Sequence, residues 1–140
     1  MNQNVMIVGV GGQGSLLASK MLGHVVMQAG YDVKVSEVHG MSQRGGSVVT
    51  YVRYSDETVW SPVINEGEAD IIISFELLEA ARWVGFLKKG GTLVVNDQKI
   101  APMPVIMGNA QYPEDIAEKL RELGVNLKIF DALHLAEEAG

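Results

Sequence analysis

Residues 5–15 read VMIVGVGGQGS, a short apolar run that is followed at once by a glycine-rich segment. The run at residues 5–8 is typical of a buried strand in a parallel sheet, and the residues after Ser15 have helical spacing. A strand, a glycine-rich loop and a helix in this order are typical of open α/β sheets. In such sheets the loops that leave neighbouring strands meet at the carboxyl edge, where ligands bind.

A second glycine-rich segment, GMSQRGG at residues 40–46, also follows a strand-like run, and we expect both segments to line one site. Backbone amides of residues 11–14 at a helix N-terminus can hold a phosphate group, with the Ser15 hydroxyl as an added donor. The Arg44 guanidinium can donate bidentate hydrogen bonds to a phosphate or a carboxylate. The predicted binding residues are Gly11, Gly12, Gln13, Gly14, Ser15, Ser42, Gln43, Arg44, Gly45 and Gly46. The alternative is that the glycines serve only close packing and subunit docking.

Periodicity predicts a three-layer α/β/α open sheet that is mainly parallel and carries an antiparallel hairpin insertion. Leu17, Met21 and Val25 recur at helical spacing, which indicates a well-buried helix over residues 15–29. The hairpin is expected from residues 47–54 and 58–60, because residues 55–57 have turn composition. The other predicted elements are strands at 33–38, 69–74, 92–95 and 126–130, a helix at 77–87, and a helix that begins at Pro113.

The length of 140 residues predicts a single domain over residues 1–140. The segment 131–140 has a helical pattern that stops at the last residue, so we expect the natural protein to continue past Gly140. No apolar run approaches the ~20 residues of a membrane span, and the N-terminus lacks a signal-peptide pattern, which predicts a cytoplasmic location. The net charge of −6 without a basic cluster argues against a nucleic-acid partner.

The absence of cysteine excludes a cysteine-ligated iron–sulfur cluster, a disulfide bond and a thiol nucleophile from this chain. The three histidines are scattered and lack zinc-ligand spacing, so the sequence predicts no metal site. Any redox centre that serves this protein is therefore expected on another chain.

Two nucleotide-binding interpretations stay open. Gly9, Gly11 and Gly14 satisfy G-x-G-x-x-G, and Glu37 lies near the end of the next predicted strand, where a ribose-binding carboxylate is found in NAD proteins. The same loop also resembles the G-x-G-G-x-G-S loop of adenylating enzymes, whose ATP site uses an arginine such as Arg44. Either interpretation makes the chain a nucleotide-binding module that acts alone.

A fuller resemblance covers nearly the whole chain. Residues 8–14 (VGVGGQG), 36–48 (SEVHGMSQRGGSV) and 74–80 (SFELLEA) closely resemble the gamma-type subunit or domain of 2-oxoacid:ferredoxin oxidoreductases. The nearest resemblance within that family is to the indolepyruvate enzymes. It implies an accessory subunit that is inactive alone and that assembles with a larger subunit carrying thiamine diphosphate, magnesium and iron–sulfur clusters.

In this family the complex decarboxylates a 2-oxoacid such as pyruvate oxidatively, passes electrons to ferredoxin and transfers the acyl group to coenzyme A. The resemblance implies that coenzyme A binds at the assembled site, and that the glycine-rich loops lie near it. His39 is a candidate for proton transfer near the thiamine, although a histidine in a loop also serves structural hydrogen bonds.

Overall fold

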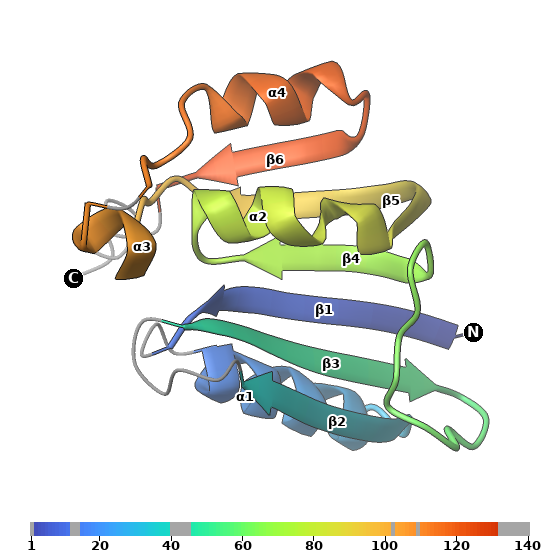
Figure 1. Cartoon of the computed structure of the whole chain (residues 1–140). Helices are drawn as coiled ribbons and strands as arrows, with labels where there is room; N and C mark the ends of the chain where they lie inside the picture. The colour runs from blue at the N-terminus through green and yellow to red at the C-terminus, as the bar shows by residue number, and fades with distance from the viewer. Residues whose placement is uncertain (1, 12–14, 40–45, 102, 109, 132–140) are drawn as a thin grey trace.

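A computed structural model describes residues 2–11, 15–39, 46–101, 103–108 and 110–131. Figure 1 shows one open sheet with helices on both faces. In chain order the elements are β1 (Asn2–Val10), α1 (Ser15–Gln28), β2 (Asp32–His39), β3 (Ser47–Ser55), β4 (Ala69–Ser74), α2 (Leu77–Trp83), the 3-10 helix η1 (Val84–Phe86), β5 (Leu87–Asn96), α3 (Met103–Ile106), α4 (Ile116–Glu122) and β6 (Asn126–Phe130).

The six strands lie in the order β2-β3-β1-β4-β5-β6. The neighbours β1 and β4, β4 and β5, and β5 and β6 are parallel, whereas β3 runs antiparallel to both β1 and β2. The three-layer, mainly parallel fold with an antiparallel insertion is therefore confirmed. Solved structures with the same arrangement are described below.

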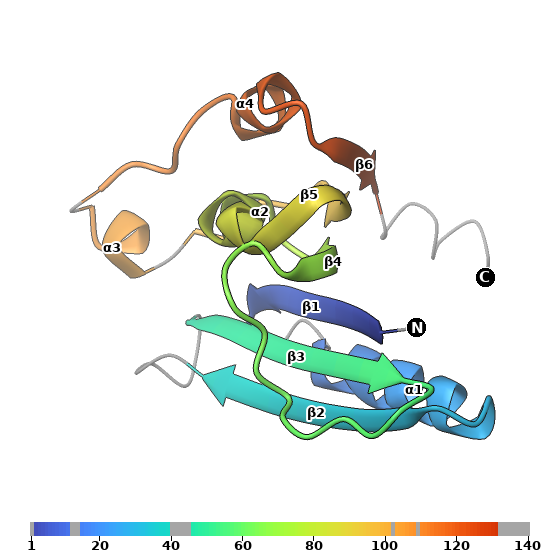
Figure 2. The same cartoon turned by 90° about the vertical axis from the view of Figure 1, so that its right-hand side faces the viewer.

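The larger part of the core lies between the sheet and the helices α2 and α4. Met6, Ile72 and Leu93 of the central strands are fully buried there, beside Leu77 of α2 and Leu120 of α4. A smaller cluster lies on the opposite face, where Val5, Ile7 and Val52 pack against Ala18 and Leu22 of α1. Figure 2 shows the sheet turned on edge, with α1 and α2 on opposite sides of it.

The position of the antiparallel hairpin differs from the one predicted. The strand β3 pairs with β2 and β1, and residues 58–60 form no strand. The Val59 amide instead donates to Asp32 Oδ2 at 2.7 Å, and the Arg53 guanidinium donates to the Ser61 and Val63 carbonyls at 2.9 and 3.0 Å. These side chains satisfy the backbone of the segment after β3, so that it crosses to β4 without a strand partner.

The prediction that α1 is well buried is wrong for its apolar stripe. Leu17, Met21 and Val25 are 63%, 62% and 61% exposed. The helix packs on the sheet through the side that carries Ala18, Leu22 and Val26. The reason is geometric: a helix on the outside of a sheet has one face to bury, and apolar spacing does not reveal whether anything covers the other.

The helix after β4 is shorter than predicted, because the chain leaves η1 at Phe86 and enters β5 at Leu87. Gly90 and Gly91 lie inside this strand. Gly90 has φ of +85°, and a Cβ on Gly91 would lie 2.9 Å from the Asp70 carbonyl oxygen. Both glycines permit the irregular start of the β4–β5 pair.

No helix among the residues described is long and apolar enough to cross a lipid bilayer.

Candidate functional site

The two glycine-rich segments meet at the end of the sheet where β1 and β2 terminate. The β1–β3 ladder ends with Val10 opposite Ser47, and just beyond it the Gly11 amide donates to the Gly46 carbonyl at 3.0 Å. This contact agrees with the expectation that both segments line one region. The Gly11 amide therefore already donates a hydrogen bond within the chain. The predicted anion site then depends on the backbone amides of residues 12–14.

Most of the predicted binding residues cannot be placed. Gly12, Gln13, Gly14, Ser42, Gln43, Arg44 and Gly45 lie outside the described residues. Ser15 begins α1, and His39 ends β2 opposite Val48, but the side chains of both also lie outside the described part. Ligand binding by these residues stays a prediction.

A buried carboxylate on α2 binds Ser47, the residue directly after the second glycine-rich segment. Glu79 is 4% exposed. It accepts hydrogen bonds from the Ser47 hydroxyl at 2.5 Å, from Trp83 Nε1 at 3.2 Å and from Arg82 Nε at 3.2 Å. Since Ser47 follows Gly46 directly, Glu79 ties α2 to the start of β3 and hence to the contact with Gly11. Charge-assisted hydrogen bonds of this kind are stronger than neutral ones.

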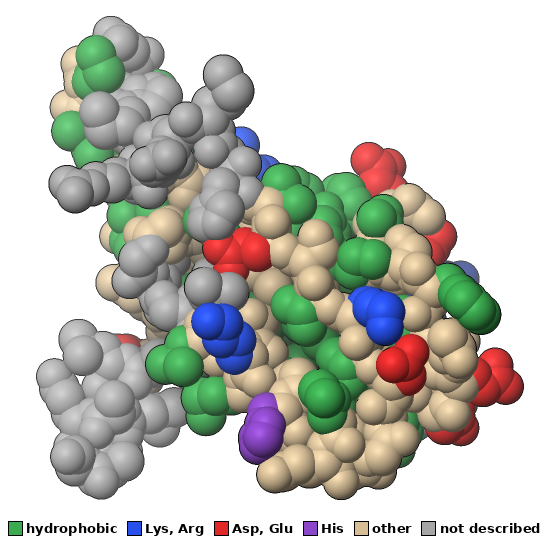
Figure 3. Space-filling model, turned by 90° about the horizontal axis from the view of Figure 1, so that it is seen from below, with side chains coloured by type: hydrophobic (Ala, Val, Ile, Leu, Met, Phe, Trp, Pro, Cys, Tyr) green, Lys and Arg blue, Asp and Glu red, His purple; other side chains and the backbone are tan. Residues whose placement is uncertain are grey.

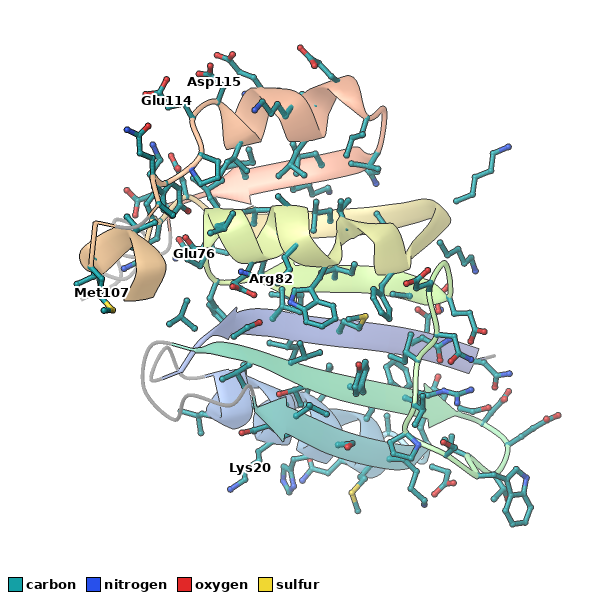
Figure 4. The ribbon with its side chains drawn as sticks, in the orientation of Figure 1. Lys20, Glu76, Arg82, Met107, Glu114 and Asp115 are labelled. Atoms are coloured by element: carbon teal, nitrogen blue, oxygen red, sulfur yellow. The ribbon has the colours of Figure 1, made fainter. Side chains whose placement is uncertain are left out.

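A second buried carboxylate, Glu76, lies where β4 ends and α2 begins (Figure 4). It is 1% exposed and caps α2 by accepting from the Glu79 amide at 2.8 Å. It also accepts from the Ile100 amide at 3.1 Å and from the Tyr112 hydroxyl. Glu76 thus closes the first turn of α2 and holds the chain that follows β5.

The same contacts determine the protonation of Tyr112. Burial, followed by its hydrogen bond to Glu76, raises the pKa of the Tyr112 phenol well above its usual value. The phenol therefore keeps its proton at neutral pH and acts as a donor. Tyr112 also accepts from the Leu78 amide at 3.0 Å, so this cluster anchors the segment before α4 to the start of α2.

The strand order removes the geometric basis of the NAD-binding interpretation. That interpretation needs the strand that carries Glu37 to lie beside β1. In this sheet β3 lies between them, with Thr50 opposite both Glu37 and Ile7. Two strand spacings, about 10 Å, therefore separate β2 from the loop after β1.

The sequence alone did not indicate Glu79 or its serine partner. Arg82 and Trp83 follow Glu79 by three and four residues, a spacing that is also typical of side-chain contacts on an exposed helix surface. The Ser47 hydroxyl, however, is 32 residues away along the chain. Only the fold brings it to Glu79.

Comparison with known proteins adds the family context. The chain matches the family described as pyruvate ferredoxin/flavodoxin oxidoreductase over residues 4–140. It is 49% identical to the indolepyruvate oxidoreductase subunit IorB of Thermococcus kodakarensis, over 98% of this chain and 69% of that protein. It is 27% identical to the common gamma subunit of the pyruvate/ketoisovalerate oxidoreductases of Thermococcus litoralis, over 93% of this chain and 64% of that subunit. The chain thus spans about two thirds of the length of these relatives.

Solved structures share the fold. The pyruvate oxidoreductase subunit PORC of Thermotoga maritima matches with a TM-score of 0.66 and 21% identity, over 98% of this chain and 66% of that one. A 2-oxoglutarate:ferredoxin oxidoreductase of Magnetococcus marinus, solved with 2-oxoglutarate, coenzyme A and succinyl-CoA bound, matches with a TM-score of 0.70 and 18% identity. That match covers 98% of this chain but 21% of the other, so the same fold is there part of a much longer chain.

Proposed function

This chain belongs to the pyruvate ferredoxin/flavodoxin oxidoreductase family, and we propose that it is the accessory subunit of a 2-oxoacid:ferredoxin oxidoreductase of the indolepyruvate or arylpyruvate type. The observation that carries the proposal is the 49% identity, over 98% of the chain, to a protein that is itself an indolepyruvate oxidoreductase subunit. The partner in this proposal is a larger subunit, in keeping with the longer chain that contains the same fold.

In the proposed reaction the bond between the carboxylate and the 2-oxo carbon of the substrate breaks and CO₂ leaves. The acyl group forms a thioester with coenzyme A, whose thiol proton is released, and two electrons pass to two molecules of oxidised ferredoxin. We place the thiamine diphosphate, magnesium and iron–sulfur clusters that supply this chemistry on the larger subunit, because this chain has no cysteine to ligate a cluster. The complex is proposed to be cytoplasmic.

The contribution of this chain is to position an anionic group of the substrate or of coenzyme A. The α1 N-terminus follows the first glycine-rich segment, and its first turn contains no acidic residue that would repel an anion. The Gly11–Gly46 hydrogen bond joins the described ends of the two segments, and Glu79 binds Ser47, the residue after Gly46. Arg44, two residues before Gly46 in the sequence, is proposed to supply a cation for this anionic group, and His39 is proposed to serve proton transfer.

Reconstitution tests the proposal directly. The chain purified alone is expected to be colourless, free of thiamine diphosphate and inactive with 2-oxoacids. Addition of the larger subunit is expected to give 2-oxoacid-dependent ferredoxin reduction that requires coenzyme A. The measurements are the visible spectrum, the thiamine content and the rate of ferredoxin reduction with indolepyruvate, phenylpyruvate and pyruvate. Stoichiometric iron or flavin in the isolated chain, or full activity without a second subunit, contradicts the proposal.

Nucleotide titration separates this function from the stand-alone alternatives. Because β2 is not adjacent to β1, NAD and NADP are expected to give no saturable calorimetric signal at submillimolar concentration. ATP is expected to give none either, because the proposed function is acyl transfer and not adenylation. The control is Glu37→Ala, which is expected to leave these titrations unchanged. Tight NAD binding that disappears in Glu37→Ala revives the dehydrogenase-like interpretation.

A further inference from the structure

The outward side of α1 is apolar although nothing in the described chain covers it. Leu17, Met21, Val25 and Met27 are each more than 60% exposed, and we call them the α1 face. Lys20 is the only residue of this 14-residue helix with a fixed charge. A helix that is apolar around most of its circumference is typical of a buried position. The α1 face therefore has the composition of a surface that is covered in an assembly.

A groove of about 510 Å³ adjoins this face between α1 and the edge strand β2. Its lining includes Lys20, Gly23, His24, Met27, Val33 and Val35. Figure 3 shows the molecule from the side of β2 and α1, with hydrophobic side chains gathered across the middle of the view. The groove adjoins the α1 face through Met27, and Lys20 and His24 lie on its border.

Gly23 keeps this groove open at a cost to the helix. It lies in the interior of α1, where glycine is less favourable than alanine. A Cβ at Gly23 would lie 3.7 Å from Val35 Cγ2 and 3.9 Å from Val33 Cγ1, which are ordinary van der Waals contacts. Nothing among these contacts requires glycine, because alanine fits and gains packing. The missing side chain instead leaves room for an atom from outside the chain.

The charges on the groove identify the kind of occupant. Lys20 and His24 lie on its border, and none of the described residues that line it is acidic, although the whole chain carries a net charge of −6. Figure 4 shows Lys20 extending away from the sheet. In a symmetric pair of copies this groove would offer Lys20 no acidic partner, because none of its described lining residues is acidic. An apolar segment that carries a carboxylate complements it.

We propose that the α1 face and the α1–β2 groove dock the larger subunit of the oxidoreductase, through an apolar segment with a carboxylate that pairs with Lys20. This inference rests on the proposed function and specifies where the partner binds. It leaves the glycine-rich segments at the end of the sheet free to face the reacting centre of the assembled enzyme.

The test measures the dissociation constant of the complex formed with the larger subunit. Met21→Glu introduces a charge into the α1 face and is expected to raise the dissociation constant roughly 100-fold or more. Lys20→Glu is expected to raise it roughly tenfold, while Lys20→Arg stays near wild type. Both positions are exposed in the isolated chain, so the melting temperature of each variant is expected to stay unchanged.

Matched controls use side chains of the same type elsewhere. Met107, which follows α3 and is 66% exposed, is replaced in Met107→Glu, and the exposed Lys89 at the start of β5 is replaced in Lys89→Glu. Both are expected to assemble as wild type. Gly23→Ala is a separate test of the groove. It is expected to raise the melting temperature of the isolated chain by about 3–5 °C, because alanine is more favourable than glycine inside a helix. It is also expected to weaken assembly, because the added methyl group occupies part of the groove.

The outcomes are distinguishable. If Met21→Glu and Lys20→Glu assemble normally, or if Met107→Glu weakens assembly as much as Met21→Glu, the docking assignment is overturned while the proposed function stands. A chain that sediments alone as a dimer and becomes monomeric in Met21→Glu assigns the face to a second copy and also overturns it. A wild-type chain that binds no larger subunit overturns the proposed function together with this assignment.

Discussion

Replacement of Glu76 by alanine is expected to lower the free energy of unfolding by roughly 3–5 kcal/mol, because several donors lose their acceptor at once and each unsatisfied buried donor costs ~1–3 kcal/mol. The donors are the Glu79 and Ile100 amides and the Tyr112 hydroxyl. A loss of this size is a large fraction of the stability of a typical domain. Urea unfolding of the isolated chain, followed by circular dichroism, measures it.

Two variants control for side-chain truncation and for loss of charge. Tyr112→Phe removes one of the donors to Glu76 and is expected to cost about 1–2 kcal/mol. Glu114→Ala removes an exposed carboxylate just before α4 and is expected to change stability by less than about 0.5 kcal/mol. If Glu76→Ala is as stable as Glu114→Ala, the cap does not hold the start of α2.

Local patterns in the sequence predicted the elements that depend on their own residues. The apolar run at residues 5–8, the glycines after it and the helical spacing of α1 identified the first strand, loop and helix. The same holds for β4, a short apolar run, and for β6, in which polar and apolar residues alternate before Phe130. In each case the hydrophobic period and a glycine boundary are contained within about a dozen residues.

Features that depend on contacts between residues far apart in the sequence could not be predicted from local patterns. The Asp32 carboxylate accepts from the Val59 amide across 27 residues, and this contact replaces the strand predicted at residues 58–60. The insertion of β3 between β2 and β1 likewise follows from sheet packing. Apolar spacing in α1 identified a helix, but it did not show that Leu17 and Met21 lie on the uncovered side.

The proximity of the two glycine-rich segments was expected from the sequence, whereas the buried contacts beside them were not. The rule that loops after parallel strands share one edge led to the two glycine-rich segments, and the Gly11–Gly46 hydrogen bond brings their ends together. The carboxylates that stabilise this edge have partners 32 and 36 residues away, as Glu79 has in Ser47 and Glu76 in Tyr112. Such pairs exist only in the folded chain, so spacing alone could not reveal them.

The largest effect on catalysis is expected from Arg44, the only cationic residue of fixed charge in either glycine-rich segment. Its place in the chain lies between the end of β2 and Gly46, which contacts Gly11. A hydrogen bond to a charged partner contributes about 1.5–3 kcal/mol. Arg44→Ala is therefore expected to lower kcat/KM of the assembled enzyme by roughly ten- to a hundredfold or more.

Arg44→Lys distinguishes the effect of the positive charge from that of bidentate hydrogen bonding, because lysine keeps the charge but lacks the guanidinium group. Its kcat/KM is expected to lie between that of wild type and Arg44→Ala, while both variants still form the complex. If Arg44 serves only to dock the subunits through an ion pair, the complexes instead dissociate on dilution and the intact fraction keeps normal kinetics. Activity and sedimentation measured on the same samples distinguish these results, and normal kinetics in an intact Arg44→Ala complex exclude Arg44 from the binding site.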